Sequence, residues 1–542
     1  MTEATSKEPS PALGPDHIVC EGRERNYLLG WKLHALTVSV CVGLFLANLE
    51  ISIVSTSLVA ITDDLKGFEQ GSWIVTSYLL TYTGLLIIWA KLSDIFGRKS
   101  LLLTSLLVFT VFSGACGAAQ SITQLIALRA FQGIGASGIY SIVLVIFYEM
   151  VPSAKYPAYT AVVAALFTVS LLLGPLLGGL INVHTTWRWV FLLNVPAGAI
   201  AMIGVISFLP NNFPNHGRSD LVSWSQTWSL RAFNRVDFLG SLLLLSANAL
   251  LVAALEQAAE GSAWSSLSII TCLAFAALLW PSFVGWEFLV SSRNLAQEPV
   301  VPWRFFKSRV VSGLLLNTFL MGVLFTVCVI QIPLKFQAVN GASPLNAGIH
   351  LLPYALACPT GSIIVAILTN PKRGLPPIFM FLVGASLQVA GIALMSTIPT
   401  TREIWPGQHG YEFVTGLGVG ISIGAASIIG PFTIQTESDL AVIAASVVQF
   451  RVMGGAMGLA LVTCVTNPYI KRQLSGILTD SEIAGIFESI ATVVHLQPAQ
   501  QERVRTSFAE GFSLQMKILV GFGAAQYLAT ALMWQKNAIR VK

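Results

Sequence analysis

Fourteen apolar stretches recur along this chain and constrain its fold more than any other feature. Most of them reach about 20 residues, the length that an α-helix needs to cross the hydrocarbon core of a bilayer. They lie at 33–58, 71–89, 100–118, 122–150, 158–181, 189–209, 236–256, 267–289, 309–332, 345–368, 376–396, 410–433, 440–466 and 513–535. Only 11% of the residues are charged, against about 25% in soluble domains. The sequence therefore predicts an all-α polytopic membrane protein with 14 spans.

Basic residues predict the orientation of these spans. If the N-terminus lies inside, most of the 31 Lys and Arg residues fall in inside segments, as the positive-inside rule requires. Both termini are then cytoplasmic. The net charge of +5 is accounted for by these basic loops, so we expect lipid and not nucleic acid as a partner. Residues 1–32 are polar and lack the apolar core of a cleaved signal.

A short charged segment, residues 90–99 (AKLSDIFGRK), separates the second and third stretches. It resembles the inner loop between spans 2 and 3 of the major facilitator superfamily, G-x-L-x-D-x-x-G-R-K, with Ala90 in place of the first glycine. The matching residues are Leu92, Asp94, Gly97, Arg98 and Lys99. The resemblance implies that this turn is an inner gate. It also implies that Glu149, in a segment similar to the family's D-L-V-P, pairs with Arg98.

Two ionisable residues within the first and fourth spans are candidates for proton coupling. Glu50 stands where the resembling family carries an aspartate, and Arg129 begins a segment similar to the family's R-x-x-Q-G-x-G, which continues with Gln132. Charged groups within spans are costly and normally face a cavity or a partner. Two alternatives remain open at this point: Arg129 extends to the outer surface, or Glu50 faces water at the outer edge.

The fifth span contains a proline and closely spaced glycines. A proline within a helix removes a backbone hydrogen bond and bends the helix, and glycines allow neighbouring helices to approach closely. The pattern G-P-x-x-G-G resembles the signature of the antiporter branch of the superfamily. It is formed by Gly174, Pro175, Gly178 and Gly179.

The thirteenth span places two polar residues, Gln449 and Arg451, beside three glycines. Together with Gln132 they are candidates for the lining of a central cavity, where Arg451 would bind an anion or a carboxylate. The alternative is that Arg451 has a packing partner such as Glu437 or Asp439.

Residues 187–198 (WRWVFLLNVPAG) resemble the start of span 6 in fourteen-span drug:proton antiporters, and the motifs together point to the fungal-type multidrug and metabolite efflux group. The resemblance implies the major facilitator fold, with two six-helix bundles plus two additional helices. The expected divisions are a tail at 1–32, a first bundle at 33–210, a loop at 211–235, two inserted helices at 236–290 and a second bundle at 291–542. Residues 467–512 form an outer segment, either one or two amphipathic helices or a solvated loop.

The implied function is proton-coupled export of amphipathic small molecules by alternating access. A siderophore exporter or a proton-coupled importer would share nearly every motif, and a non-transporting membrane protein or a membrane enzyme are more distant alternatives. The seven histidines and seven cysteines show no catalytic or metal-binding grouping, so we expect no enzyme activity, metal or cofactor. A monomer in the plasma membrane, in preference to the vacuolar membrane, is expected, with protons and a small molecule as its ligands.

Overall fold

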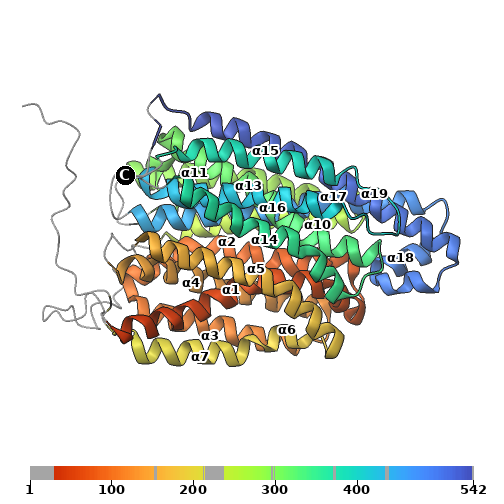
Figure 1. Ribbon diagram of the computed structural model, residues 1–542, viewed down its shortest axis with the longest axis horizontal. Coiled ribbons are helices and arrows are strands. Elements are labelled where there is room, and N and C mark those ends of the chain that lie inside the picture. The colour runs from red at the N-terminus through yellow and green to blue at the C-terminus, as the bar shows by residue number, and fades with distance from the viewer. Residues whose placement is uncertain are drawn as a thin grey trace, which may run out of the picture.

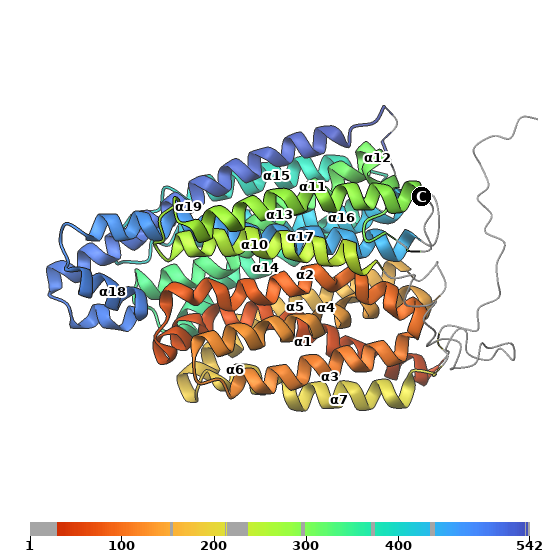
Figure 2. The same ribbon diagram turned by 180° about the vertical axis from the view of Figure 1, so that it is seen from behind.

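Long helices run side by side through the whole structure (Figure 1). The computed structural model describes residues 30–151, 156–211, 213, 237–293, 297, 299–369, 374–433, 439–536 and 538–539, and every regular element in those residues is helical. Helix α1 begins, and helix α19 ends, at the same end of the bundle, which we call the termini end. Helix α18 lies at the opposite end, which we call the cap end (Figure 1, Figure 2).

The first half of the bundle contains six predicted spans. Its elements are α1 (Trp31–Leu65), η1 (Phe68–Gln70), α2 (Gly71–Phe96), α3 (Arg98–Gly117), α4 (Ile122–Glu149), α5 (Tyr156–His184), α6 (Arg188–Leu192) and α7 (Asn194–Phe208). The sixth span is formed by α6 and α7 together. Helices α1, α2 and α4 bury apolar side chains on most of their surface, which places them inside the bundle, whereas α3 and α7 have exposed outer faces that suit contact with lipid.

The second half repeats this arrangement. Its elements are α12 (Trp303–Lys307), α13 (Arg309–Ala338), α14 (Pro344–Leu368), α15 (Pro377–Met395), α16 (Gln408–Ile429), η3 (Gly430–Thr433), α17 (Asp439–Leu474), α18 (Asp480–Glu488), η4 (Ile490–His495) and α19 (Pro498–Leu532). Helix α1 packs on α5 as α13 packs on α17, and α2 packs on α4 as α14 packs on α16. The two halves meet where α5 contacts α14 and where α2 contacts α17.

A helical hairpin, α10 (Phe238–Ala259) and α11 (Leu267–Ser292), covers the α2–α17 side of this junction (Figure 2). Helix α10 is held there by a buried carboxylate, because Glu256 accepts hydrogen bonds from Ser72 at 2.5 Å and from Thr76 at 3.3 Å on α2. Most of α11 is exposed. The predicted inserted pair is therefore an outer layer that bridges both halves.

Twelve helical segments of the described residues are long and apolar enough to cross a membrane. The two other predicted spans correspond to α5 and α19. The apolar part of α5, Val169–His184, is shorter than a full span. Polar residues such as Gln515, Lys517 and Gln526 interrupt the apolar part of α19. The structure thus bears out twelve spans, and the count of fourteen is not confirmed.

Residues 467–512 are helical, so the solvated-loop alternative is wrong. Helix α17 extends beyond its apolar part, α18 and η4 follow, and α19 returns toward the bundle. Helix α18 begins with a capping box between Thr479 and Glu482, which satisfies backbone N–H groups that a helix start leaves free. The segment has its own apolar core, made by Ile470, Leu474, Leu478, Ile483, Ile486, Phe487, Val493 and Val504. We call residues 467–512 the outer cap.

Of the other sequence predictions, the loop at 211–235 lies outside the described residues, apart from positions 211 and 213. The side chains of Asp94 and Asp439, and all of Glu437, also lie outside them.

Candidate functional site

A buried ion pair joins the first and fourth helices of the first half. One guanidinium nitrogen of Arg129, Nη1, lies 2.5 Å from Oε1 of Glu50, and both side chains are almost completely excluded from solvent. The alternatives in which Arg129 extends to the surface or Glu50 faces water are therefore wrong. Since removing two charges from water is costly, this pair requires further partners.

Neutral groups from three other helices, α2, α3 and α7, and from α4 itself complete the site. Asn194 of α7 donates to Glu50 Oε2 at 2.7 Å, and Arg129 Nε donates to the carbonyl oxygen of Ile74 on α2 at 3.1 Å. Gln132 accepts from Arg129 Nη1 at 2.8 Å and donates to Ser113 of α3 at 3.0 Å. The guanidinium carbon also lies 4.3 Å from the ring centre of Tyr78 on α2, a cation–π contact. With these partners the two buried charges are solvated by fixed dipoles.

Sequence reasoning missed Asn194, Ser113 and Tyr78 as members of this site. A signal for Asn194 was present, since it is the asparagine of the WRWVFLLNVPAG stretch. Gln132 was expected to line a cavity. Its amide lies inside the first half, and it does not line either of the two hollows described below.

Three tyrosines connect the ion pair to a hollow between the two halves. The rings of Tyr78 and Tyr82 lie 5.9 Å apart, and those of Tyr82 and Tyr140 lie 6.2 Å apart. Tyr140 lines a hollow of about 610 Å³ between α4, α5, α16 and α17. A change in the position of Arg129 can therefore reach the hollow through packed rings.

This hollow, which we call the termini-end cavity, is apolar and aromatic. Its lining residues are Tyr140, Leu144, Phe147, Tyr159, Val163, Ala426, Ser427, Gly430, Pro431, Ala444, Val447 and Val448. None of these carries a charge.

The candidate residues on α17 lie in the same junction but outside this lining. The guanidinium of Arg451 lies 5.2 Å from the ring centre of Phe167 on α5, so it faces the first half. Gln449 is buried, and its Oε1 has no hydrogen-bond partner among the described residues. Neither of the expected carboxylate partners of Arg451 has a described side chain.

The glycines of the GPxxGG segment bring α5 close to two neighbours. A Cβ atom at Gly174 would lie 2.0 Å from Ser52 Oγ, and one at Gly178 would lie 2.5 Å from the carbonyl oxygen of Ile53 on α1. On its other side, α5 meets the second half, because a Cβ atom at Gly179 would lie 2.5 Å from the Cα atom of Leu345 on α14. Helix α5 thus packs closely between α1 of its own half and α14 of the second half.

The carbonyl oxygen of Pro175 contacts both α1 and α14. Thr56 of α1 donates to the Pro175 carbonyl oxygen at 3.4 Å, and a Cβ atom at Gly348 of α14 would lie 2.5 Å from the same oxygen. The motif therefore lies where α1, α5 and α14 pack together. This packing has to rearrange if the halves rotate relative to each other.

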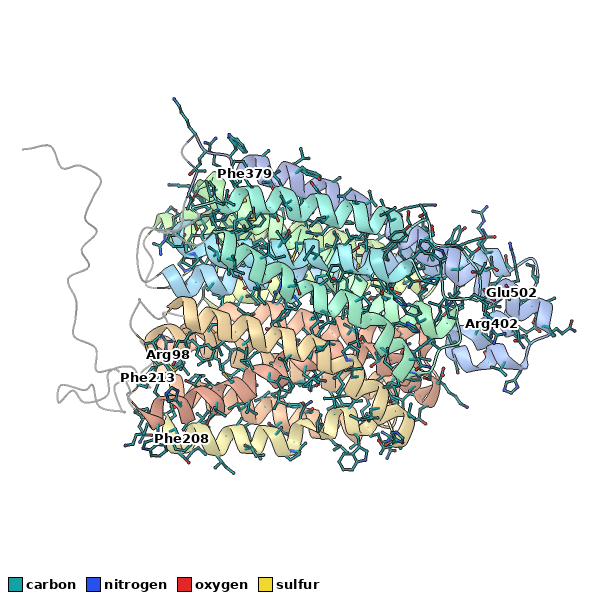
Figure 3. All side chains as sticks on the ribbon, viewed as in Figure 1. Arg98, Phe208, Phe213, Phe379, Arg402 and Glu502 are labelled. Carbon is teal, nitrogen blue, oxygen red and sulfur yellow. The ribbon has the colours of Figure 1, made fainter. Side chains whose placement is uncertain are left out.

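The charged turn lies at the termini end, where Figure 3 labels Arg98. Gly97 has a φ of 92°, a left-handed conformation that glycine adopts at low cost, and this lets α3 start directly after α2. Arg98 then forms a bidentate pair with Glu149 at the end of α4, with Nε–Oε2 and Nη2–Oε1 distances of 3.0 and 2.7 Å. The structure therefore brings together the two residues whose pairing the resemblance implied.

Further contacts tie this turn to its neighbours. Arg98 Nη1 donates to Ser93 Oγ at 2.6 Å, and Lys99 Nζ donates to the Ile206 carbonyl oxygen at 2.8 Å on α7. Lys91 donates to the carbonyl oxygen of Pro299, in the segment before α12. The turn thus contacts α4, α7 and the start of the second half.

We expect Arg98→Ala and Glu149→Ala to lower export to a similar extent, because each change breaks the same two-bond ion pair. The double variant should lose little more than either single variant, since residues in direct contact have non-additive effects. The measurement is a double-mutant cycle on export rate, corrected for the amount of protein in the membrane. Losses that add up fully would show that the two side chains do not act together.

The outer cap of the second half docks on the first half at the cap end. Ser489 donates to Asp63 Oδ1 at 2.5 Å, Lys471 pairs with Glu69, and the ring of Phe68 packs against Phe487 and Phe508. These contacts connect the two halves at this end. Burial and, to a smaller extent, the nearby charge of Glu69 raise the pKa of Glu260. Glu260 directly follows α10, and its carbonyl oxygen accepts a hydrogen bond from Lys471.

We expect a covalent link across this contact to stop transport. A cysteine pair at Asp63 and Ser489, joined by a short bifunctional reagent, would hold the cap on the first half. Export should fall after cross-linking and should return when a cleavable linker is cut. A cross-linked protein that exports at the uncross-linked rate would show that the cap stays docked throughout the cycle.

Sequence comparison places the chain among membrane transporters. The family model described as Major Facilitator Superfamily matches residues 40–463. The chain is 43% identical over 515 residues to the MFS-type transporter FPY5 of Fusarium mangiferae, covering 95% of this chain and 86% of that protein. It is 28% identical over 510 residues to the rubrofusarin-specific efflux pump aurT of Gibberella zeae, covering 93% and 89%. It is 29% identical over 525 residues to the acurin A biosynthesis cluster MFS-type transporter of Aspergillus aculeatus, covering 96% and 89%.

Solved structures agree on the fold. A bacterial homologue of the human lysosomal transporter Spinster, in an inward-facing and occupied conformation, superposes with a TM-score of 0.62 at 12% identity, covering 94% of this chain and all of that chain. The xylose transporter XylE from E. coli, in a partially occluded inward-open conformation, gives a TM-score of 0.52 at 12% identity, covering 93% and 99%.

Proposed function

Because the chain belongs to the Major Facilitator Superfamily, we propose that it is a proton-coupled exporter of amphipathic small molecules that works by alternating access. Relatives named as efflux pumps and as transporters of biosynthetic clusters support export. The observation that carries the proton coupling is the buried Glu50–Arg129 pair, which packed tyrosine rings connect to a cavity whose described lining residues are uncharged.

The coupling step is exchange of a proton at Glu50. With Glu50 ionised, its charge and that of Arg129 hold α1 and α4 together. Protonation of Glu50 removes one of the two charges, and Arg129 then binds more strongly to its neutral partners, Gln132 and the Ile74 carbonyl. The ring of Tyr78, 4.3 Å from the guanidinium, moves with it, and the tyrosine series passes this shift to the termini-end cavity.

The substrate site of the proposed exporter is the termini-end cavity. An apolar and aromatic surface without charges binds amphipathic molecules through buried area and selects weakly between them. Gln449 and Arg451 lie near the junction and are proposed to contact the substrate's polar groups once the halves separate. An unpartnered buried amide oxygen such as Gln449 Oε1 is the kind of group that a ligand or water satisfies.

The membrane topology of the proposed exporter has fourteen spans, as in the drug:proton antiporter family, with α5 and α19 as the two further spans. Both helices are needed to complete the six-helix halves that the packing repeat describes. We propose that the termini end is cytoplasmic, with the charged turn as the inner gate and the outer cap outside. The proposed exporter is a monomer in the plasma membrane and requires no cofactor.

The experiment that tests this function uses cells that lack their own broad-range efflux pumps. Cells expressing the protein should accumulate less of a fluorescent rhodamine dye, an amphipathic probe, than cells with an empty vector, and a proton-conducting uncoupler should abolish the difference. Higher accumulation in expressing cells would identify an importer. Equal accumulation with this dye and with a panel of aromatic fungal metabolites would contradict the proposal.

A further inference from the structure

The second half carries a charged pair on the two helices that correspond to those of Glu50 and Arg129. In the first half, the carboxylate lies on the first helix, α1, and the cation lies on the fourth helix, α4. In the second half, Lys335 lies on the first helix, α13, and Glu412 lies on the fourth helix, α16. Since the helix packing of the two halves repeats, the same two helices carry an acid and a base in each half, with the signs exchanged.

Hydrogen bonds connect this second pair through an amide. Lys335 Nζ donates to Gln408 Oε1 at 2.5 Å, and Gln408 Nε2 donates to Glu412 Oε1 at 2.7 Å. The other carboxylate oxygen, Oε2, lies 3.4 Å from His409 Nδ1. Glu412 is fully buried, whereas the His409 side chain is 32% exposed. The histidine thus connects a buried carboxylate to the protein surface.

A second histidine lies against the first one. The rings of His350, on α14, and His409 are stacked with centres 5.1 Å apart and planes inclined by 4°, and His350 also stacks on Phe336 at 4.6 Å. Two imidazolium charges at this separation repel each other. The histidine pair therefore holds at most one proton readily, and this proton can be shared with Glu412.

The titratable groups that face this cluster come from helices α13, α14 and α16, and Glu69 of η1 lines the same hollow as Lys335. Helix α13 contributes Lys335 and Cys328, α14 contributes His350, and α16 contributes His409 and Glu412. Helix α19 contributes an aromatic ring, that of Phe512, with its centre 5.5 Å from Lys335 Nζ. Among these described residues, Lys335 is the positive charge that balances Glu412.

The cluster lies next to a hollow and close to a buried hydroxyl that has no hydrogen-bond partner among the described residues. Lys335 lines a hollow of about 710 Å³ beneath the outer cap, together with Gln331, Asn467 and Gln515. One helical turn from His350, the fully buried hydroxyl of Tyr354 has no hydrogen-bond partner among the described residues. A buried polar group without a protein partner is the kind of group that a water molecule or a functional role explains.

We propose that Lys335, His350, His409 and Glu412 form a second proton-binding site, through which the second half exchanges protons with the solvent at the cap end. This inference rests on the proposed function as a proton-coupled exporter. Glu412 is the group that binds the proton, the two histidines pass it to and from the surface, and Lys335 stabilises the ionised carboxylate. Proton uptake at this site weakens the attraction between α13 and α16, as proton uptake at Glu50 does for α1 and α4.

The direct test follows protonation itself and needs no transported molecule. Infrared difference spectra of the purified full-length protein in lipid vesicles are recorded between about pH 5 and about pH 8, the range in which histidine titrates. Protonated-carboxyl bands of both Glu50 and Glu412 should be present in the wild type, and Glu412→Gln should lose only the band of Glu412. His409→Gln should shift the midpoint of this band by about one pH unit, and His184→Gln, which changes an exposed histidine at the end of α5, should leave it in place.

A spectrum of Glu412→Gln that matches the wild type would overturn the second site, because Glu412 would then keep one protonation state. A band that is lost in Glu50→Gln alone would also overturn it, while leaving the proposed function intact. A wild type without any pH-dependent carboxyl band would contradict both.

Transport measurements separate a proton-binding role from a structural role. In vesicles loaded with the rhodamine dye, Glu412→Gln should lower gradient-driven export by at least about fivefold, which corresponds to the lower end of typical coupling free energies. Exchange of dye without a gradient should be retained. Equal loss of both activities would show that Glu412 only stabilises the fold.

Discussion

Glu50→Gln is expected to abolish the use of a proton gradient, with a fall in export of at least about fivefold. Glutamine has nearly the same shape as glutamic acid and cannot ionise, so the site stays in its neutral form throughout the cycle. Substrate binding should persist, because Glu50 does not line the termini-end cavity. Glu50→Asp should retain part of the activity, since the charge remains and only its reach is shorter.

The structure adds a stability effect to this prediction. Removing one partner of a buried ion pair typically costs about 3–5 kcal/mol, because the other charge is left uncompensated. The melting temperature of Glu50→Gln should therefore fall, and Glu50→Gln combined with Arg129→Gln should recover part of the loss. Glu403→Gln, which changes an exposed carboxylate, is the matched control. Gradient-driven export at the wild-type rate in Glu50→Gln would place the proton site elsewhere.

Gly178→Leu is expected to inactivate or uncouple the transporter. A Cβ atom at this position would lie 2.5 Å from a backbone oxygen of α1, so α5 must move away from α1 and press on α14. Gly178→Ala should have a smaller effect of the same kind. The measurements are dye export and proton leak in vesicles, with and without dye.

The control for this change is Gly521→Leu on α19. A Cβ atom there would meet no atom within 4 Å, so the same added side chain should be tolerated. Wild-type coupling in Gly178→Leu would show that the close approach of α5 and α1 has no role in the transport cycle.

The sequence was most informative where one residue type has one physical explanation. An acid and an arginine within two spans predicted a buried site, and the structure brings Glu50 and Arg129 together. The glycines around Pro175 predicted close packing, which the contacts with α1 and α14 show. Each apolar stretch predicted a helix, although some helices extend well beyond their stretch, as α19 does by beginning at Pro498 and not at residue 513.

Other features were not accessible because they depend on which helices become neighbours. Lys335 and Glu412 are 77 positions apart in the printed sequence, and no local pattern relates them. Asn194 lies in a stretch that the sequence identified only as the start of a span, and its amide donates to Glu50 on a distant helix. The outer cap was ambiguous because its apolar residues are interrupted by charged ones. Its docking on the first half depends on contacts between distant segments, such as those of Phe487 with Phe68 and of Ser489 with Asp63.

The measurement that tests the central claim most directly is proton movement during substrate movement in the same vesicles. A pH-sensitive dye enclosed in vesicles reports protons, while the rhodamine dye is applied as a concentration step without any imposed pH gradient. The wild type should move protons in the direction opposite to the rhodamine dye, and Glu50→Gln should move none. Rhodamine movement in the wild type without proton movement, or with protons moving in the same direction, would contradict the account.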